Sequence, residues 1–332
     1  MRDLARAVAA YAADCGFQGT VRVDLGARTL VDAAYGLADR AHGIAHTPDT
    51  RCAMASGSKT FTALAVLALV QDGVLSLGTS VRDLLAPDLP RLDPDVTIAH
   101  LLSHTSGVGE YLDDDAESAQ YLLPGSMHEY GAAHDFLGLL DQPMAGVPGA
   151  QFVYSNAGFV ILGVVLERVT GARFQDVVRE RVLAPAGLAR TDFLRTDELP
   201  GDAAIGYLWP DRLRTNIFHL PIEGSADGGA YTTTADLRAF WLALSSGAIV
   251  SPHLTQLMTT PAPGHDPSDP YGLGVWLPAA GVWAMGGADA GVSLSSVHRP
   301  GSDLTRSVLS NQSDGAWPMA TKIRELCESL GT

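Results

Sequence analysis

The stretch MASGSKTFTALAVLALV, residues Met54–Val70, joins a turn of small residues to a long apolar run. From Lys59 onward apolar residues recur at helical spacing until Gly73, which would cap the helix C-terminus. The pattern predicts a central, buried helix that begins close to Ser56. The chain holds only two lysines, Lys59 and Lys322, and arginine supplies the positive charge elsewhere. A lysine at position 59 therefore calls for a chemical reason.

Ser56 and Lys59 are three positions apart, so a helix places them on the same face. A serine hydroxyl is a weak nucleophile until a neighbouring base accepts its proton. A lysine can be that base when burial and nearby positive potential lower its pKa, and a helix N-terminus supplies such potential. Arginine cannot, because it does not deprotonate in proteins. S-x-x-K alone is a weak signal, and the alternative is a surface lysine on a frayed turn, but its place at the start of a buried helix favours a catalytic pair.

A second pair of polar residues, Tyr154 and Asn156, comes directly before the apolar run AGFVILGVVL. On an extended segment both side chains project to the same side, while Ser155 points away. A phenol can relay protons, and an asparagine amide can orient both a lysine and a substrate carbonyl. Taken in isolation, the pattern is more typical of an asparagine that caps a helix and a tyrosine that fills the core, and it gains weight only beside the Ser56–Lys59 pair.

The order of the predicted elements indicates an α+β fold. Residues 19–39 alternate apolar and polar side chains around a Gly-Ala-Arg turn, which predicts a two-stranded hairpin. Residues 76–196 have a mostly helical pattern punctuated by proline and glycine. We therefore expect an antiparallel sheet flanked by helices, formed by residues 1–75 and 197–332, with a mostly helical domain of residues 76–196 inserted and a cleft between the two.

The C-terminal part contains the remaining sheet elements. Thr234 is predicted to cap a helix in TADLRAFWLALSSG. Residues 271–287, 291–300 and 304–312 are each predicted to form one strand, and residues 316–330 the final helix.

Composition excludes several classes of function. The 332 residues carry a formal net charge of −15 with a pI near 4.9, which disfavours nucleic acid as a partner. The longest uncharged apolar runs have about ten residues, half of what a membrane-spanning helix needs. Cys15, Cys52 and Cys327 are scattered, so neither a disulfide framework nor a thiolate metal site is indicated. The N-terminal segment has the pattern of an amphipathic helix, and we expect a cytoplasmic protein.

Ser56-x-x-Lys59, then Tyr154-x-Asn156, then a glycine-rich segment WAMGGADAG together resemble the serine β-lactamase-like superfamily. This superfamily includes class C β-lactamases, D-Ala-D-Ala carboxypeptidases, D-aminopeptidases and family VIII carboxylesterases. The resemblance extends through TIAHLLSHTSGV, GGAYTTTADLRAF and YGLGVWL, from about residue 20 to 315. It is specific for the superfamily and unspecific for the substrate.

The resemblance implies an acyl-enzyme mechanism without a cofactor or metal. Ser56 would attack the carbonyl, Lys59 and Tyr154 would share the general acid and base work, and Asn156 would orient Lys59 and the substrate. The backbone N–H groups of Ser56 and Ala288 would hold the oxyanion.

One position departs from the pattern of the superfamily. Met285 stands where relatives carry lysine or histidine, followed by Gly286 and Gly287. Loss of this polar group lowers the expectation of β-lactam or D-Ala-D-Ala turnover, since it would help to bind a substrate carboxylate. Any residue supplies the backbone donor, so the oxyanion site is expected to survive.

Two further patterns have weaker interpretations. His100 and His104 are four positions apart and could ligate a metal, but no H-E-x-x-H motif accompanies them. The acidic run YLDDDAESAQ, residues 111–120, is typical of a solvated loop and could line the rim of the cleft, where it would repel anionic substrates.

The sequence thus predicts a serine hydrolase that forms an acyl-enzyme on Ser56 and acts on a small-molecule ester or amide, most like a carboxylesterase. A D-amino-acid amidase or peptidase, or a weak β-lactamase, remains open within this class. The alternative of a different class is a binding protein of the same fold that has lost turnover, which Met285 motivates.

Overall fold

The computed structural model describes residues 2–113, 123–265 and 268–329. Its α-helices are α1 (Arg2–Cys15), α2 (Lys59–Gln71), α3 (Val81–Leu85), α4 (Ile98–Leu102), α5 (Leu137–Leu140), α6 (Asn156–Thr170), α7 (Phe174–Val178), α8 (Thr234–Ser246), α9 (Pro252–Met258) and α10 (Ala316–Ser329). Its strands are β1 (Gly19–Leu25), β2 (Arg28–Tyr35), β3 (Leu37–Asp39), β4 (Ile44–Ala45), β5 (Cys52–Ala53), β6 (Tyr231–Thr232), β7 (Trp276–Ala279), β8 (Val282–Asp289), β9 (Val292–Arg299) and β10 (Leu304–Ser310). Short helical turns include η1 (Ala55–Ser58) and η4 (Arg179–Leu183).

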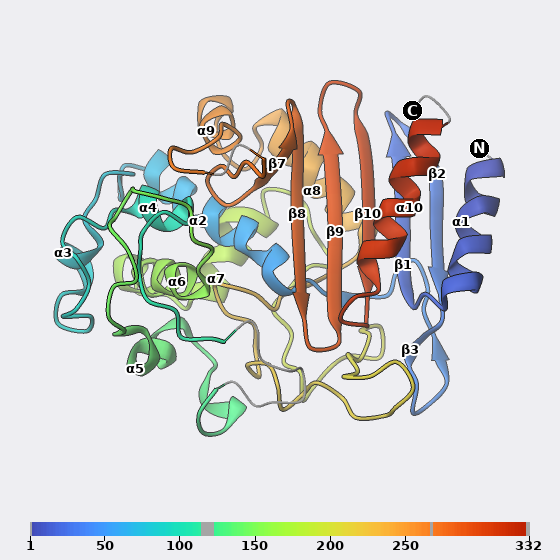
Figure 1. Cartoon of the computed structure of the whole chain (residues 1–332), viewed down its shortest axis with the longest axis horizontal. Helices are drawn as coiled ribbons and strands as arrows, with labels where there is room; N and C mark the ends of the chain where they lie inside the picture. The colour runs from blue at the N-terminus through green and yellow to red at the C-terminus, as the bar shows by residue number, and fades with distance from the viewer. Residues whose placement is uncertain (1, 114–122, 266–267, 330–332) are drawn as a thin grey trace.

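The main sheet has six antiparallel strands in the order β2-β1-β10-β9-β8-β7. β1 and β2 form the predicted hairpin, with Gly26 at a positive φ of 57° in the turn. β1 also pairs with β10, Gly19 opposite Ser310, so segments from the two ends of the chain lie side by side. Helices α1 and α10 cover one face of this sheet and α8 packs on the other (Figure 1). The predicted α+β class, with an antiparallel sheet flanked by helices, is confirmed.

Two local predictions differ from the structure. Residues 271–287 contain two strands rather than one, because the chain turns at Gly281, where φ is 68°. Helix α8 is capped by Thr233 and not by Thr234, since the Thr233 side chain accepts the N–H of Asp236. Both errors concern where an element begins or ends.

Helix α2 is the centre of the molecule, as its sequence predicts. Every residue of α2 from Lys59 to Leu69 is buried, and so is every residue of α6 from Asn156 to Leu166. The main hydrophobic core is continuous through α2, α6, α8 and the buried residues of β8 and β9. The helices α3 to α7 lie beside the sheet, on the side of β7 and β8 (Figure 1). This arrangement places the N-terminus of α2, and with it Ser56, next to strand β8.

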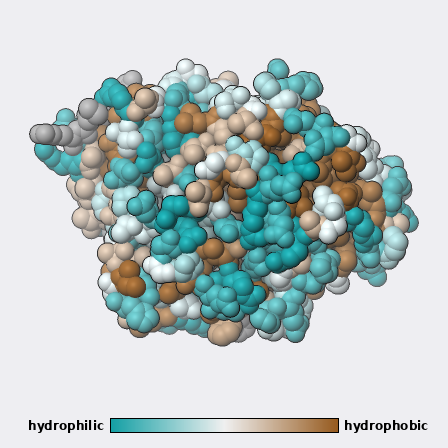
Figure 2. Space-filling view, turned by 180° about the vertical axis from the view of Figure 1, so that it is seen from behind, coloured by the Kyte–Doolittle hydropathy of each residue, from teal (hydrophilic) through white to brown (hydrophobic). Residues whose placement is uncertain are grey.

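Among the described residues, no helix is long and apolar enough to cross a membrane. On the face opposite to that of Figure 1, hydrophobic residues form separate patches between hydrophilic ones (Figure 2).

Candidate active site

Ser56 lies in the turn η1, immediately before helix α2. Ala55 precedes it with a positive φ of 46°, an uncommon conformation for a residue other than glycine. Ser58 fixes the turn from within, because its hydroxyl donates to the carbonyl of Ala55 at 3.0 Å and accepts the N–H of Ala230 at 3.0 Å. The Ser56 side chain stays half-buried and lines the cleft. The turn thus presents one hydroxyl on a rigid support.

Lys59 is 2% exposed and lies beside Ser56, as the three-residue spacing predicts. Its Nζ donates to Ser56 Oγ at 2.9 Å, to Asn156 Oδ1 at 2.8 Å and to the carbonyl of Asp227 at 2.6 Å. A protonated amine uses all three acceptors. A neutral amine has two N–H groups and one lone pair, and Asn156 Oδ1 and the carbonyl can only accept. Its lone pair must therefore face the Ser56 hydroxyl, in the geometry that a base requires.

The segment 223–230 supplies the third acceptor and is hydrogen-bonded to helix α2. The Thr62 hydroxyl donates to the carbonyl of Ala226 at 2.6 Å, and Met54 N–H donates to the carbonyl of Ala230 at 2.8 Å. The neighbouring pairing of β5 with β6 extends this contact. The Asp227 carbonyl is therefore held in place on both sides.

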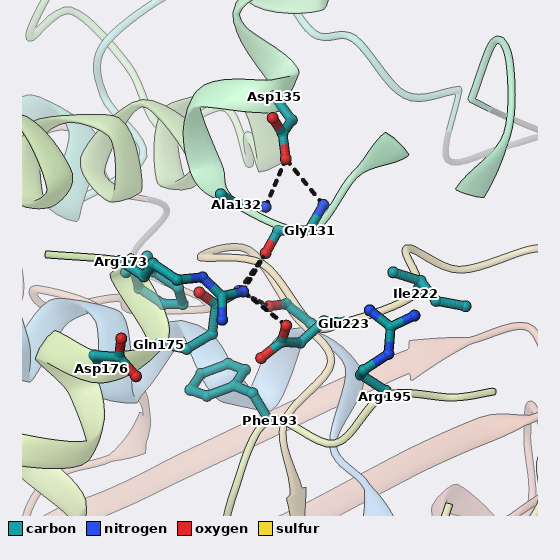
Figure 3. Close-up of polar contacts among 12 residues, drawn as sticks. Gly131, Ala132, Asp135, Arg173, Gln175, Asp176, Phe193, Arg195, Ile222 and Glu223 are labelled. Atoms are coloured by element: carbon teal, nitrogen blue, oxygen red, sulfur yellow. Dashed lines mark hydrogen bonds and ion pairs between the residues drawn. The ribbon is translucent and has the colours of Figure 1, made fainter. Parts of the chain in front are cut away.

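The same segment is anchored to the helical region through Glu223 (Figure 3). Arg173 donates to Glu223 Oε2 at 2.7 Å and to the carbonyl of Gly131 at 2.8 Å. Gln175 Nε2 donates to the carbonyls of Gly131 and Gly224 at 3.1 and 3.0 Å. Glu223 is buried, and Arg173 is its partner from the start of α7. No sequence motif indicated this network.

Tyr154 and Asn156 both reach the Ser56–Lys59 pair. Lys59 Nζ lies 5.0 Å from the centroid of the Tyr154 ring, and Tyr154 lines a cavity together with Ser56. Asn156 is the first residue of α6, but Ser155 is the cap, since its Oγ accepts the N–H of Gly158 at 2.9 Å. The Asn156 side chain is consequently free of a capping role and binds Lys59.

Glu110 holds the N-terminus of α6 in place and was missed by the sequence analysis. Its Oε2 accepts the N–H of Asn156 at 2.7 Å, and its Oε1 accepts those of Ala157 at 3.1 Å and Tyr111 at 2.8 Å. Burial raises the pKa of this carboxyl, although these N–H donors oppose the shift. Glu110 directly precedes the acidic run of residues 111–120, and no motif distinguishes it from that run. Tyr111, next to it, donates to Asp227 Oδ2 at 2.7 Å, and burial and the carboxylate raise its pKa well above the ordinary value.

His104 supports Tyr154, and its position does not match the helical pair with His100 that the four-residue spacing suggested. It has a positive φ of 56°, beyond the end of α4, so His100 and His104 do not share a helical face. Its Nδ1 accepts the N–H of Ser155 at 3.0 Å, and its ring lies 4.4 Å from that of Tyr154. Burial and the nearby Lys59 hold the pKa of His104 well below its usual range. No group of three potential metal ligands occurs in the part of the chain that the structure describes.

The third motif lies on β8, directly against the turn η1. A Cβ at Gly287 would lie 2.6 Å from the carbonyl oxygen of Met54 and 2.7 Å from the backbone nitrogen of Ser56, so only glycine fits. The next residue, Ala288, lines the cleft together with Ser56. Met285, in the position of the cation of the superfamily, is 2% exposed and part of the main core.

Two cavities meet at Ser56, Asn156 and Ala288. The first has a volume of about 370 Å³, and neither lysine nor arginine occurs among its described lining residues. Its lining includes four aspartates: Asp113, Asp227, Asp289 and Asp314. The second, of about 490 Å³, has no charged side chain in its described lining. Tyr111 and Asp113 of the acidic run thus line the cleft, while residues 114–120 of that run lie outside the described residues.

Comparison with known proteins identifies the fold and the family. A family model described as Beta-lactamase matches residues 4–327. The penicillin binding protein from Bacillus halodurans superposes with a TM-score of 0.87 at 36% identity, over 97% of this chain and 98% of that one. A D-stereospecific amidohydrolase from Streptomyces sp. superposes with a TM-score of 0.79 at 26% identity, over 99% and 98%.

Curated relatives of this chain include both a penicillin-binding protein and an esterase. Penicillin-binding protein 4* of Bacillus subtilis (strain 168) is 28% identical over 71% of this chain and 54% of its own length. Esterase EstB of Burkholderia gladioli is 37% identical over 49% of this chain and 44% of its own length. The chain thus spans about half the length of these two relatives. Since the family model covers nearly the whole chain, this protein belongs to the Beta-lactamase family of serine hydrolases.

Proposed function

We propose that this protein is an esterase-type serine hydrolase that forms an acyl-enzyme on Ser56. The observation that carries the proposal is the contact of 2.9 Å between Lys59 Nζ and Ser56 Oγ, with the other two acceptors of Lys59 fixed at Asn156 and Asp227. This geometry directs a lone pair of the neutral amine at the hydroxyl proton.

In the first half of the reaction, the Ser56 oxygen attacks the substrate carbonyl while its proton moves to Lys59 Nζ. The oxyanion accepts hydrogen bonds from the backbone N–H groups of Ser56 and Ala288. Collapse of the tetrahedral intermediate breaks the bond to the leaving group, which takes a proton from Lys59 through Tyr154. In the second half, the same two residues remove a proton from water, which attacks the acyl-Ser56 ester. Collapse of this second intermediate breaks the bond to Ser56 Oγ, which takes the proton back, and the acid is released.

An ester is favoured over a β-lactam because Met285 offers no cation for a substrate carboxylate and is buried in the core. The similarity to Esterase EstB supports the same choice. We expect the acyl group in the first cavity, which Tyr154 does not line, and the leaving group in the second, which it does.

A D-amino-acid amidase or peptidase is the second candidate. The four aspartates of the first cavity favour it, because they would attract the ammonium group of an amino-acid amide. The D-stereospecific amidohydrolase from Streptomyces sp. has the same fold, which makes the alternative concrete. Weak β-lactamase activity is a third outcome to be measured.

Two measurements test the proposal. A fluorophosphonate probe should label the wild type at Ser56 and leave Ser56→Ala unlabelled; a binding protein without turnover would remain unlabelled in both. Rates on p-nitrophenyl acetate and butyrate, compared with nitrocefin and D-Ala-p-nitroanilide, then rank the candidates. Wild-type rates no higher than those of Ser56→Ala on all four substrates would refute the proposal that this protein is a serine hydrolase.

A further inference from the structure

The second cavity has a composition that the proposed reaction does not explain. Its lining combines Trp276 from β7, Trp317 from α10 and Tyr154 with a wall of small or apolar residues on β8: Ala284, Met285, Gly286, Gly287 and Ala288. Apart from the phenol of Tyr154 and the indole N–H groups, the polar side chains among the described lining residues are Ser56, Asn156 and Ser295. A cavity with flat aromatic walls and no charge favours an apolar ligand.

The aromatic rings are placed by specific contacts. The Trp276 ring is nearly parallel to that of Tyr154, at an interplanar angle of 9° and a centroid distance of 6.4 Å. The Trp317 ring lies close to the backbone of Gly286, since a Cβ built on Gly286 would be 3.3 Å from this ring. Trp317 is nevertheless 39% exposed, which is unusual for a side chain of this size. Trp317 and Ser56 line the same cavity, so a ligand bound there can contact this partly exposed indole.

Met285 determines the charge that this cavity accepts. Its thioether side chain is buried and lines the cavity, and the described lining includes neither lysine, arginine nor histidine. A carboxylate bound here would lose its hydration without gaining a cationic partner. The four aspartates on the other side of Ser56 add to the repulsion.

We propose that the second cavity is a subsite for an uncharged aromatic leaving group, held by Trp317 and Trp276 along the glycine-rich part of β8. The assignment to the leaving group rests on the proposed function, because it depends on Tyr154 as the proton donor. The substrate class is then an aryl or arylalkyl ester without a carboxylate on the alcohol.

A binding experiment tests the subsite without turnover. In Ser56→Ala, calorimetry compares 2-naphthol with 6-hydroxy-2-naphthoate, which differ by one carboxylate. The neutral compound is expected to bind at least about tenfold more tightly. Trp317→Ala in the same background should weaken 2-naphthol binding about fivefold or more, while Trp317→Phe should stay within about twofold. Equal affinity for the two compounds, or unchanged binding in Trp317→Ala, would overturn the subsite.

A kinetic experiment tests its use in the reaction. The acetates of the same two alcohols share one acetyl-enzyme, so kcat/KM compares only its formation. The neutral ester should react at least about tenfold faster in the wild type, and Met285→Lys should narrow the ratio while Met285→Leu preserves it. A lysine at this buried position can also prevent folding. If Met285→Lys is not obtained in folded form, the comparison of Trp317→Ala with Trp317→Phe decides the proposal.

The two proposals fail in different ways. If the protein hydrolyses esters through Ser56 but Trp317→Ala leaves the affinity for 2-naphthol unchanged, the subsite alone is overturned. A protein that binds 2-naphthol through Trp317 but hydrolyses no ester faster than Ser56→Ala overturns the proposed function, and the assignment to the leaving group with it.

Discussion

Two adjacent glycines of β8 offer a matched test of the oxyanion site. A Cβ at Gly287 would lie 2.6 Å from the carbonyl oxygen of Met54 and 2.7 Å from the backbone nitrogens of Ser56 and Gly57. Ordinary contacts are longer, so Gly287→Ala must separate β8 from the turn η1 by about 0.8 Å. All three atoms belong to the backbone, so none of them can move away by a side-chain rotation. The separation would increase the distance between the N–H groups of Ser56 and Ala288.

The expected loss follows from that displacement. Removal of one oxyanion donor lowers kcat by about 10² to 10³, and overpacking costs about 1 to 3 kcal/mol of stability. Gly286→Ala is the control, because its Cβ would meet the Trp317 ring at 3.3 Å, a side chain that can move, and the carbonyl oxygen of Leu294 only at an ordinary contact distance of 3.6 Å. We expect kcat on ethyl acetate, whose leaving group has no ring that could contact Trp317, to stay within about threefold of wild type for Gly286→Ala.

The assay measures kcat, the rate of fluorophosphonate labelling and the melting temperature for both variants. A Gly287→Ala protein with wild-type kcat would refute the placement of β8 against Ser56. Equal losses in both variants would show that the contact with η1 is not what matters.

Three further predictions follow from buried and charged groups. Burial lowers the pKa of His46 and of His298 from 6.5 to about 4, so the unfolded chain binds protons first as the pH falls, and stability is lost between pH 6.5 and about 4. Each histidine should cost about 2 kcal/mol at about pH 5, and a melting temperature unchanged from pH 7 to 5 would contradict this. Glu110→Gln replaces one of the two oxygens that accept backbone N–H groups with an NH2 group that cannot accept, and should lower kcat about tenfold with little change in KM; a change in KM alone would argue against a positioning role. The aspartates of the first cavity should slow hydrolysis of the monophenyl ester of pimelic acid several-fold relative to phenyl heptanoate. Asp289→Asn and about 0.5 M salt should each reduce this difference in rate between the two esters. Equal rates in the wild type would contradict an electrostatic repulsion by the aspartates.

The central helix and the reactive pair could be predicted because their determinants are local. Helix α2 is apolar on all sides, and Lys59 follows Ser56 by a fixed helical spacing, so neither depends on distant residues. The third acceptor of Lys59 is a backbone carbonyl 168 positions away, for which no side-chain pattern exists. Glu110 likewise acts on a helix that begins 46 positions later. Such contacts arise from the tertiary fold alone.

Errors in the predicted elements have a similar physical origin. The strands β7 and β8 are both mostly apolar, and the turn at Gly281, with its positive φ, separates them. At α8, three consecutive threonines can each supply a capping oxygen, and the fold selects Thr233. The aromatic cavity required both β7 and α10, which are brought together only in the folded chain.

The direct test of the account is the rate at which Ser56 is acylated when Lys59 cannot accept a proton. Intact-mass measurement of the acetyl-enzyme formed from p-nitrophenyl acetate should show it about 10² to 10⁴ times slower in Lys59→Arg than in the wild type, with no adduct in Ser56→Ala. Circular dichroism of the same samples establishes that Lys59→Arg is folded. A folded Lys59→Arg protein that is acylated at the wild-type rate would contradict the claim that Lys59 is the base.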